Sequence, residues 1–411
     1  MRGTINRRKF IKTAGTTAAA LSLPVESFSI LSGNTTTPNQ RDNPLVAVVR
    51  DMSAHSGSLV MTDIAQVMMD EAVRRYTGIM DIGAAYQSVF EGITINDVIG
   101  IKVNCINGDL PTHPAMVYAL ANGLQKMNLG GNPFPANNII IWDRTDAELL
   151  NCGYTYNSGP TGIRCFGTTT AGYNSMFLNC NGSDQHPSNI LTDYCDYLVN
   201  FAVLKNSNVA GVTLCMKNHY GSIHAPSSMH GGFCNPFTPA LNQQIRDALT
   251  VQENLFIVDA IFGCYTGGCQ VPPNMIYDGL ILGGDRVAVD AVGRQILDDH
   301  GCPTIYMSGH IDTAAERPYN LGTADLEEIE CIEVLNPSDA VENLTIIHDA
   351  PDVVLNWSTP EYTGDFKVLR SVDPGFNSYD EIATLIGNTY TDAGASSSSE
   401  KFFYRVVKTW G

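Results

Sequence analysis

Short apolar runs alternate with amphipathic segments along most of the chain, and this alternation constrains the fold more than any other feature. LVAVVR at 45–50 has the pattern of a buried strand, and apolar residues at helical spacing follow it from 58 to 76. The same order recurs at IGIKVN (99–104) with 113–127, at NIIIWD (138–143) with DAELLNCG, and at DGLILGG (278–284) with 285–301. The runs 197–204, 211–217 and 254–263 are further strand candidates. Alternating strands and helices predict a layered α/β domain with a mainly parallel sheet over residues 45–330.

Two regions depart from this alternation. Residues 152–188 are rich in Gly, Thr, Asn and Cys without a usable period, which predicts a long insertion over one face. From about residue 335 only short strand patterns remain, separated by the turn signals SVDPG and TDAG, so we expect a small all-β sandwich at 335–411. The segments VVLNWSTPEY, FKVLRSVDPGF, YTDAG and FFYRVV resemble a fibronectin type III module, with Trp357 and Tyr404 as its core aromatics.

The first 33 residues have the order of an export signal. MRGTINRRKFIK carries five basic residues ahead of the mildly apolar run TAGTTAAALSLP. NRRKFIK resembles the twin-arginine export motif. We therefore predict a signal peptide at 1–33, a linker at 34–44, and a protein carried by the twin-arginine machinery to the periplasm or the exterior.

Charge and hydropathy exclude two classes of partner. The chain has 24 basic and 42 acidic residues, a formal net charge of −18. A surface of this sign repels phosphate backbones and anionic membranes, so no nucleic-acid partner is expected. No apolar run beyond the signal reaches the ~20 residues needed to cross a bilayer, so no membrane span is expected in the mature chain.

Polar residues stand where the predicted strands end, at Lys102, Asn104, Asp143, Lys217 and Asp259. Ligands of open α/β sheets bind at the carboxyl ends of the strands, so we expect these side chains to converge on one cleft. A buried strand that ends in lysine needs a reason, because a desolvated ammonium is costly without a partner. Lys102 either reaches solvent or faces an anionic ligand or a carboxylate, and the second alternative is favoured.

The segment 214–234 holds the densest set of reactive side chains. If 211–217 is a strand, its period of two places Lys217 and His219 on one face and turns Asn218 away. The histidine and cysteine spacing, H-x4-H-x5-H-x3-C, matches no strong zinc motif. An acid/base site, an open metal site with His219 and His230 as ligands, and a plain polar loop all remain open.

His113 stands at a predicted helix start. The sequence THP predicts Thr112 as N-cap and Pro114 in the first turn. The helix dipole would lower the pKa of His113 and keep its imidazole neutral, as suits a base or a ligand. Simple packing at the start of the helix is the alternative.

Asp290 lies among apolar residues of the predicted helix 285–301, so we expect it to be buried and to need a cation or a donor. Lys217 or Lys102 would serve. Asp285, in contrast, has the position of an N-cap.

The eleven cysteines include no C-x-x-C pair. Cys264 and Cys269, in FGCYTGGCQV, flank a turn through Gly267 and Gly268. A short-loop disulfide is the first interpretation and shared metal ligation the second.

Taken together, IGIKVN, THPAMVYAL, NIIIWDRTDAELLNCGY, VAGVTLCMKNHYGSIHAP, HGG, FIVDAIFG and DGLILGGDRVAVDAVGRQIL resemble the uncharacterised family called domain of unknown function 362, over roughly residues 45–310. The family's polar positions fall on Lys102, Asn104, His113, Asp143, Lys217, Asn218, His230, Asp259 and Asp290. Some relatives carry ferredoxin-type cysteine clusters, which this chain lacks, and Cys264 and Cys269 replace a stretch that is usually glycine-rich. The resemblance implies a fold family and supplies no reaction.

These observations lead to one functional hypothesis and one rival. The first is an exported protein whose Lys/His/Asp cleft takes an anionic small molecule, with Lys217 and Lys102 holding the anion and His219, His230 or His113 acting as acid/base groups or metal ligands. Substrate contacts would come from Lys102, Asn104, Asn218, Asp143, Asp259 and Asp290. Proton transfer or redox chemistry, assisted by a metal or another cofactor that the sequence does not identify, fits this set. The rival is a non-catalytic exported ligand-binding or cell-surface protein.

Overall fold

The computed structural model describes residues 43–339, 341–358, 364–372, 379–398 and 401–408. It divides into two compact units, one formed by Thr36–Leu335 and the other containing Asn336–Gly411. The predicted signal peptide, and all but the last two residues of the predicted linker, lie outside the described residues. No helix in the described part of the chain is long and apolar enough to span a membrane.

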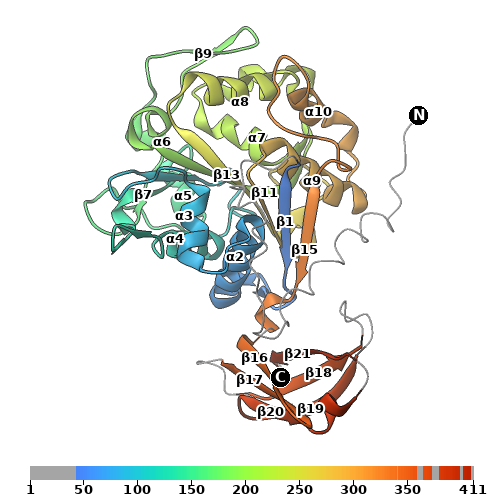
Figure 1. The fold of residues 1–411 in the computed structure, drawn as a ribbon. Helices are drawn as coiled ribbons and strands as arrows, with labels where there is room; N and C mark the ends of the chain where they lie inside the picture. Colours follow the sequence, from blue (N-terminus) through green and yellow to red (C-terminus); the bar gives the residue numbers. More distant parts are fainter. Residues whose placement is uncertain (1–42, 340, 359–363, 373–378, 399–400, 409–411) are drawn as a thin grey trace. The chain divides into compact units, whose positions relative to one another are not determined.

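The larger unit is built on one nine-stranded mixed sheet (Figure 1), with the order β15-β1-β14-β13-β11-β4-β7-β8 and β12 paired to β11. Its strands are β1 (Leu45–Arg50), β4 (Ile99–Lys102), β7 (Ile139–Trp142), β8 (Arg164–Cys165), β11 (Tyr197–Ser207), β12 (Gly211–Thr213), β13 (Gln252–Cys264), β14 (Met275–Gly283) and β15 (Glu330–Leu335). The neighbours from β8 to β13 pair in parallel, whereas β14 and β12 run against their neighbours. The predicted α/β fold with a mainly parallel sheet is therefore confirmed.

Helices cover both faces of this sheet, and the two largest apolar cores lie between them and the strands. They are α2 (Thr62–Thr77), α3 (Ile82–Val89), α4 (Pro114–Leu124), α5 (Asp146–Asn151), α6 (Thr168–Ala171), α7 (Cys215–Asn218), α8 (Phe237–Ala248), α9 (Arg286–Asp299) and α10 (His310–Ala315). The pleat of β1 sends Val49 into the core shared with α2 and α4, and Val48 into the core shared with α9. The predicted N-cap of α9 is confirmed, since the Asp285 carboxylate accepts from the amides of Val287 and Ala288.

Short elements complete the larger unit. They are the hairpins β2 (His55–Ser56) with β3 (Leu59–Val60), β5 (Asn128–Leu129) with β6 (Asn132–Pro133) and β9 (Leu178–Cys180) with β10 (Ser183–Gln185), the 3-10 turns η2 (Ala136–Asn138), η4 (His219–Ser222), η5 (Pro226–Met229), η6 (Gly231–Cys234) and η7 (Ile305–Met307), and one π turn, η3 (Ile190–Tyr194). The segment 152–188, without a period in the sequence, contains only β8, α6 and the β9–β10 hairpin.

The second unit contains two three-stranded antiparallel sheets in its described residues. One has the order β16 (Glu342–Asp349), β17 (Asp352–Ser358), β20 (Thr389–Asp392), and the other β19 (Asp380–Leu385), β18 (Phe366–Ser371), β21 (Phe403–Lys408). Two 3-10 turns, η8 (Pro337–Asp339) and η9 (Ala395–Ser397), accompany them. Alternate residues of β17 are buried, as the period-two pattern predicts. Trp357 and Tyr404 both lie in this core, and the Tyr404 hydroxyl donates to Asp392 Oδ2 at 2.7 Å.

Candidate functional site

A buried ion pair lies at the carboxyl ends of β4 and β7. These strands pair in parallel with Lys102 opposite Trp142, so the side chain of Lys102 reaches Asp143, the residue that follows β7. Lys102 Nζ donates to Asp143 Oδ1 at 2.6 Å and to the carbonyl of Val103 at 2.7 Å. Of the two alternatives for Lys102, the structure realises the one with a carboxylate.

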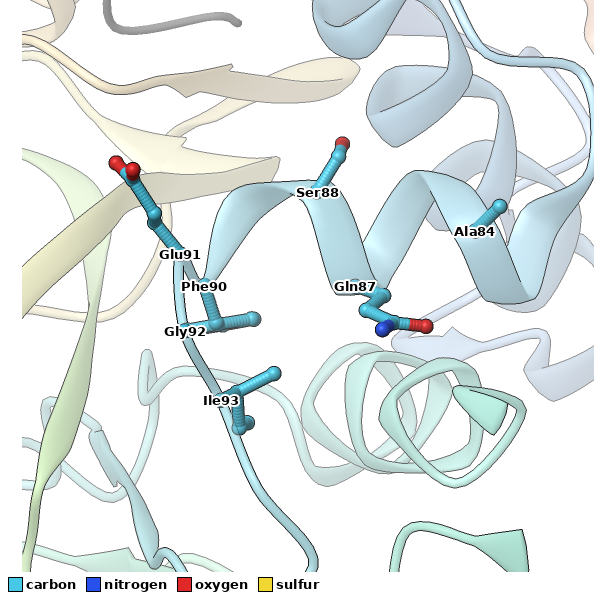
Figure 2. Close-up of a pocket in the computed structure, with 7 residues that line it drawn as sticks. All are labelled: Ala84, Gln87, Ser88, Phe90, Glu91, Gly92 and Ile93. Atoms are coloured by element: carbon cyan, nitrogen blue, oxygen red, sulfur yellow. The ribbon is translucent and has the colours of Figure 1, made fainter. Parts of the chain in front are cut away.

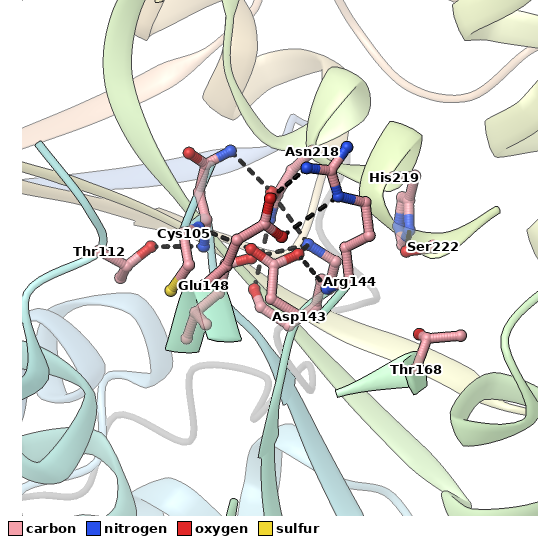
Figure 3. A network of polar contacts seen from close by, with 12 residues as sticks. Cys105, Thr112, Asp143, Arg144, Glu148, Thr168, Asn218, His219 and Ser222 are labelled. Carbon is pink, nitrogen blue, oxygen red and sulfur yellow. Dashed lines mark hydrogen bonds and ion pairs between the residues drawn. The ribbon is translucent and has the colours of Figure 1, made fainter. Parts of the chain in front are cut away.

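Backbone amides and a nearby glycine enclose this pair. Asp143 Oδ2 accepts from the amide of Cys105 at 2.6 Å, and Oδ1 also accepts from the amide of Arg144 at 2.8 Å (Figure 3). Gly221 packs directly against the pair, because a Cβ there would lie 2.8 Å from Asp143 Oδ1 and 2.9 Å from Lys102 Nζ. The charge of Lys102 is thus compensated inside the protein, and we assign the pair to holding the two strand ends together.

Asn218 connects this pair to the neighbouring strands. Its Oδ1 accepts from Asn104 Nδ2 at 3.1 Å and from Lys102 Nζ at 3.3 Å, and its Nδ2 donates to Asn200 Oδ1 at 2.9 Å. The prediction that Asn218 turns away is therefore wrong. It rested on a strand through residue 217, whereas β12 ends at Thr213 and α7 begins at Cys215.

Asp290 explains why the helix α7 begins at Cys215. Its two carboxylate oxygens accept from the amides of Cys215 at 2.8 Å and Met216 at 3.0 Å, which caps the first turn of α7. Burial raises the pKa of Asp290 to about 7 against the opposing effect of these amides. The carboxylate is buried as expected, but its donors are backbone amides and not Lys217 or Lys102.

His219 belongs to a second buried charged group. Its Nε2 lies 2.7 Å from Glu253 Oε1, its Nδ1 lies 3.1 Å from the Ser222 hydroxyl, and Arg286 Nη1 lies 3.1 Å from Glu253 Oε2. Burial alone would raise the pKa of Glu253, but the charges of His219 and Arg286 hold it at about 2. Both ring nitrogens of His219 have protein partners, an arrangement that suits a structural role, and its role as catalyst or ligand stays a prediction. No pattern in the sequence indicates Glu253, which lies at the start of β13.

His113 forms a dyad with Asp259. The backbone amide and Nδ1 of His113 lie 2.8 and 2.7 Å from Asp259 Oδ2. Burial lowers the pKa of His113, but the adjacent carboxylate outweighs burial and raises it above its usual value. The expected lowering of this pKa by the helix dipole is wrong in direction, because Asp259 lies against the imidazole. Thr112 is not the N-cap either; its hydroxyl donates to the carbonyl of Phe201, and His113 itself precedes α4.

Lys205, which is not among the predicted site residues, is fully buried and forms no ion pair with the described residues. Its exposed fraction is 0%, and its Nζ donates to Asn104 Oδ1 at 3.0 Å. Among the described residues, no carboxylate lies within ion-pair distance of this ammonium. Burial lowers the pKa of Lys205 to about 8. Lys205 continues the row of Phe201 and Val203 on the α4 side of β11, and its charge acts on His113.

Lys217 is the second buried lysine without an ion pair. It is 8% exposed, and its Nζ lies 4.5 Å from the ring centroid of Tyr220. Within the described part of the chain its Nζ has neither a hydrogen bond nor an ion pair, and burial lowers its pKa. The thiol of Cys269 acts electrostatically on both Lys217 and Lys205, so the two ammonium groups share a neighbour.

Lys217 interacts electrostatically with two histidines and with Cys234, which belongs to a strained turn. His230 stacks on Tyr220 with centroids 5.6 Å apart, and burial together with Lys217 lowers its pKa. His310 is fully buried, neither of its ring nitrogens has a hydrogen-bond partner in the described residues, and burial lowers its pKa to about 3. Phe233 and Cys234 adopt left-handed backbone conformations with φ of 59° and 62°. Such strain in non-glycine residues concentrates at functional sites.

The expected disulfide between Cys264 and Cys269 is not present. All eleven cysteines are free thiols, and Cys264 Sγ donates to the carbonyl of Thr266 at 3.0 Å and to Asn206 Oδ1 at 3.4 Å. The glycine turn between the two cysteines thus directs the Cys264 thiol to the carbonyl of Thr266 and to the side-chain amide oxygen of Asn206. In the part of the chain that the structure describes, no three His, Cys, Asp or Glu side chains are grouped so as to hold a metal ion.

A pocket of about 460 Å³ lies at the end of α3, lined by Ala84, Gln87, Ser88, Phe90, Glu91, Gly92 and Ile93 (Figure 2). None of the predicted site residues lines it. Glu91 is the one charged side chain in this lining, and we assign no role to the pocket.

The fold and these contacts define an α/β protein with a buried lysine and amide network at the carboxyl ends of its parallel strands. Residues 99–295 match the family model described as Domain of unknown function (DUF362), which supports the family resemblance seen in the sequence. No curated protein matches the chain.

Two solved structures show limited similarity. A crystal structure of pectate lyase Pel3 from Pectobacterium carotovorum is 25% identical over 16% of this chain and 21% of that chain, with a TM-score of 0.15. A crystal structure of a Thermotoga maritima protein is 9% identical over 62% of this chain and 60% of that chain, with a TM-score of 0.34. The chain therefore spans less than two thirds of either one.

Proposed function

We propose that the larger unit binds a small anionic molecule at Lys205 and Lys217 and transfers a proton to or from it through the His113–Asp259 dyad. The observation that carries this proposal is the burial of two ammonium groups without a carboxylate partner among the described residues. Burial of an uncompensated charge costs several kcal/mol. An anionic ligand would offset that cost.

The contrast with the other lysines of the same unit supports this assignment. Lys102 is equally buried but is paired with Asp143, and the partly exposed Lys126 is paired with Asp70 at 2.8 Å. Lys205 and Lys217 thus depart from the rule that buried charges are paired. His310, whose two ring nitrogens have no partner in the described residues, adds an unused polar group on which the charge of Lys217 acts.

The dyad supplies a group for proton transfer. Asp259 fixes Nδ1 of His113, which leaves Nε2 without a hydrogen-bond partner among the described residues. A histidine oriented by a carboxylate through one nitrogen and open at the other is the usual arrangement of a general acid or base. The charge of Lys205 acts on His113, so an anion bound at Lys205 would change the electrostatic field at this imidazole.

Location and accessory parts complete the proposal. The arginine pair in NRRKFIK supports export by the twin-arginine machinery, and the two three-stranded sheets after Asn336 support a fibronectin type III-like module that spaces or docks the larger unit. The chemistry proposed here rests on the larger unit alone.

Thermal unfolding of the full chain with a panel of small anions tests the binding proposal. Inorganic phosphate, pyruvate, glycolate and succinate would be compared at constant ionic strength for the wild type, Lys205→Met, Lys217→Met and the matched control Lys126→Met. At least one anion should raise the Tm of the wild type and of the control but not of the other two variants. Equal shifts in all four proteins would contradict the proposal.

The same variants contain a check on folding. Removal of an uncompensated buried charge should stabilise the protein without ligand, so Lys205→Met should melt above the wild type in anion-free buffer. A loss of binding in a variant of raised Tm cannot come from misfolding.

Deuterium exchange separates an enzyme from a binding protein. A bound anion with a C–H bond next to its carboxylate would be incubated in D₂O and followed by proton NMR. Exchange that is lost in His113→Gln and Asp259→Asn, with binding retained, is the result we expect. Binding without exchange would favour the non-catalytic binding protein.

A further inference from the structure

Cys105 and Cys152 bring two buried thiols together at the edge of the site. Cys105 follows β4, and Cys152 ends α5. Cys152 Sγ lies 3.5 Å from the carbonyl oxygen of Cys105. The two chain segments are also in contact nearby, because a Cβ on Gly108 would lie 3.6 Å from the carbonyl oxygen of Asn151.

The environments of the two thiols differ. Cys105 is 2% exposed and Cys152 is 6% exposed. The hydrogen bond with the Cys105 thiol and the charge of Lys205 lower the pKa of Cys152, whereas burial raises that of Cys105. Isolated buried cysteines behave differently, since burial raises the pKa of both Cys165 and Cys180 to about 12. Cys152 is therefore the nucleophile of this pair, because thiolates and not thiols attack oxidants.

We propose that Cys105 and Cys152 form a reversible disulfide when the protein meets a peroxide. The thiolate of Cys152 attacks one oxygen of hydrogen peroxide, the O–O bond breaks, and the leaving hydroxide takes up a proton to become water. The resulting Cys152 sulfenic acid then reacts with the thiol of Cys105, which forms the S–S bond and releases a second water. The two sulfurs lose two electrons and the peroxide gains them.

This modification does not depend on the proposed anion site. The disulfide would affect the anion site through Lys205, because the charge of Lys205 reaches both thiols. It would also affect the Lys102–Asp143 pair, because the Cys105 amide donates to Asp143. A bond between the two cysteines ties the end of β4 to the end of α5 and fixes the segment that carries Asp143.

Peptide mapping of the full-length protein tests the proposal directly. Trypsin places Cys105 in the peptide 103–126 and Cys152 in the peptide 145–164, and neither peptide holds another cysteine. After treatment with one equivalent of hydrogen peroxide and alkylation of the remaining thiols, we expect a linked pair of these peptides, about 2 Da lighter than their sum. Dithiothreitol should separate them.

Single variants test the order of the two steps. In Cys105→Ser, the sulfenic acid of Cys152 has no resolving thiol, so dimedone should label Cys152. In Cys152→Ser, Cys105 should stay largely unlabelled. The control Cys180→Ser removes an isolated buried thiol and should keep the linked peptides.

Two results would overturn the proposal. One is a wild-type map in which a low dose of peroxide oxidises other cysteines, while Cys105 and Cys152 remain reduced and are alkylated afterwards. The other is equal dimedone labelling of Cys105 and Cys152 in the two variants, which would remove the assigned nucleophile. The wild-type map decides the central point even if a serine variant fails to fold.

Discussion

Asp143→Asn is the perturbation that the structure constrains most tightly. Both carboxylate oxygens of Asp143 accept hydrogen bonds, Oδ1 from Lys102 Nζ and Oδ2 from the amide of Cys105. Asparagine offers one oxygen and one NH₂ group, so in either orientation a donor faces a donor. The ammonium of Lys102 also loses its counter-charge in a site where it is 1% exposed.

The expected cost follows from these two losses. Removal of one partner of a buried ion pair costs about 3–5 kcal/mol. Asp247→Asn is the matched control, since Asp247 pairs with Arg246 at the surface of the same unit and such pairs contribute about 0–1 kcal/mol. The double variant Lys102→Met with Asp143→Leu should recover only part of the loss, because it removes both charges but leaves the amides of Cys105 and Arg144 without an acceptor.

Urea unfolding followed by circular dichroism at 222 nm measures these differences at pH 7. The α-helices of the described residues all belong to the unit Thr36–Leu335, so this signal reports on the unit that holds the pair. A free energy of unfolding for Asp143→Asn no lower than that of Asp247→Asn would refute the buried-pair account.

Three further predictions concern the same unit. Gly221→Ala should lower the free energy of unfolding by about 1–3 kcal/mol because its Cβ meets Asp143 and Lys102, whereas Gly309→Ala, with its nearest atom 3.7 Å away, should change it little in urea titrations. The pKa of Glu253 is about 2 in the folded protein, so its stabilising contribution is present above the unfolded value near 4.5 and is lost as pH falls from 4.5 to 2. Glu253→Gln should therefore flatten the plot of unfolding free energy against pH in this range. An unchanged plot would contradict the stabilising role of the Glu253 carboxylate. Peroxide-treated protein should be about 4 kcal/mol more stable than reduced protein, since the disulfide closes a loop of roughly 50 residues, and equal midpoints would argue against a native-like bond.

Much of the sheet was predictable because its signals are local. Buried parallel strands such as β4 and β7 appear as short apolar runs, and Pro114 marks a helix start without help from distant residues. Polar residues at the ends of β4 and β7 were also predictable from local sequence. One network joins four of the predicted residues, Lys102, Asn104, Asp143 and Asn218.

The wrong predictions concern residues whose interaction partners are distant in the sequence. The run 211–217 has a strand pattern, but Asp290 caps the backbone at Cys215 and starts a helix there. The electrostatic state of His113 depends on Asp259, which lies 146 residues away. Lys205 was recoverable, since it ends an apolar run as Lys102 does, but the predicted strand stopped at residue 204.

The protonation of Lys205 tests the central claim most directly. Protein labelled with ¹³C at the lysine ε-carbon would be titrated by NMR, with the Lys205 signal assigned by its absence in Lys205→Met. Free protein should give a pKa of about 8, below the usual 10.5, because burial opposes the charge. A bound anion from the panel should raise that pKa. A Lys205 signal that titrates near 10.5 and ignores every anion would contradict the account.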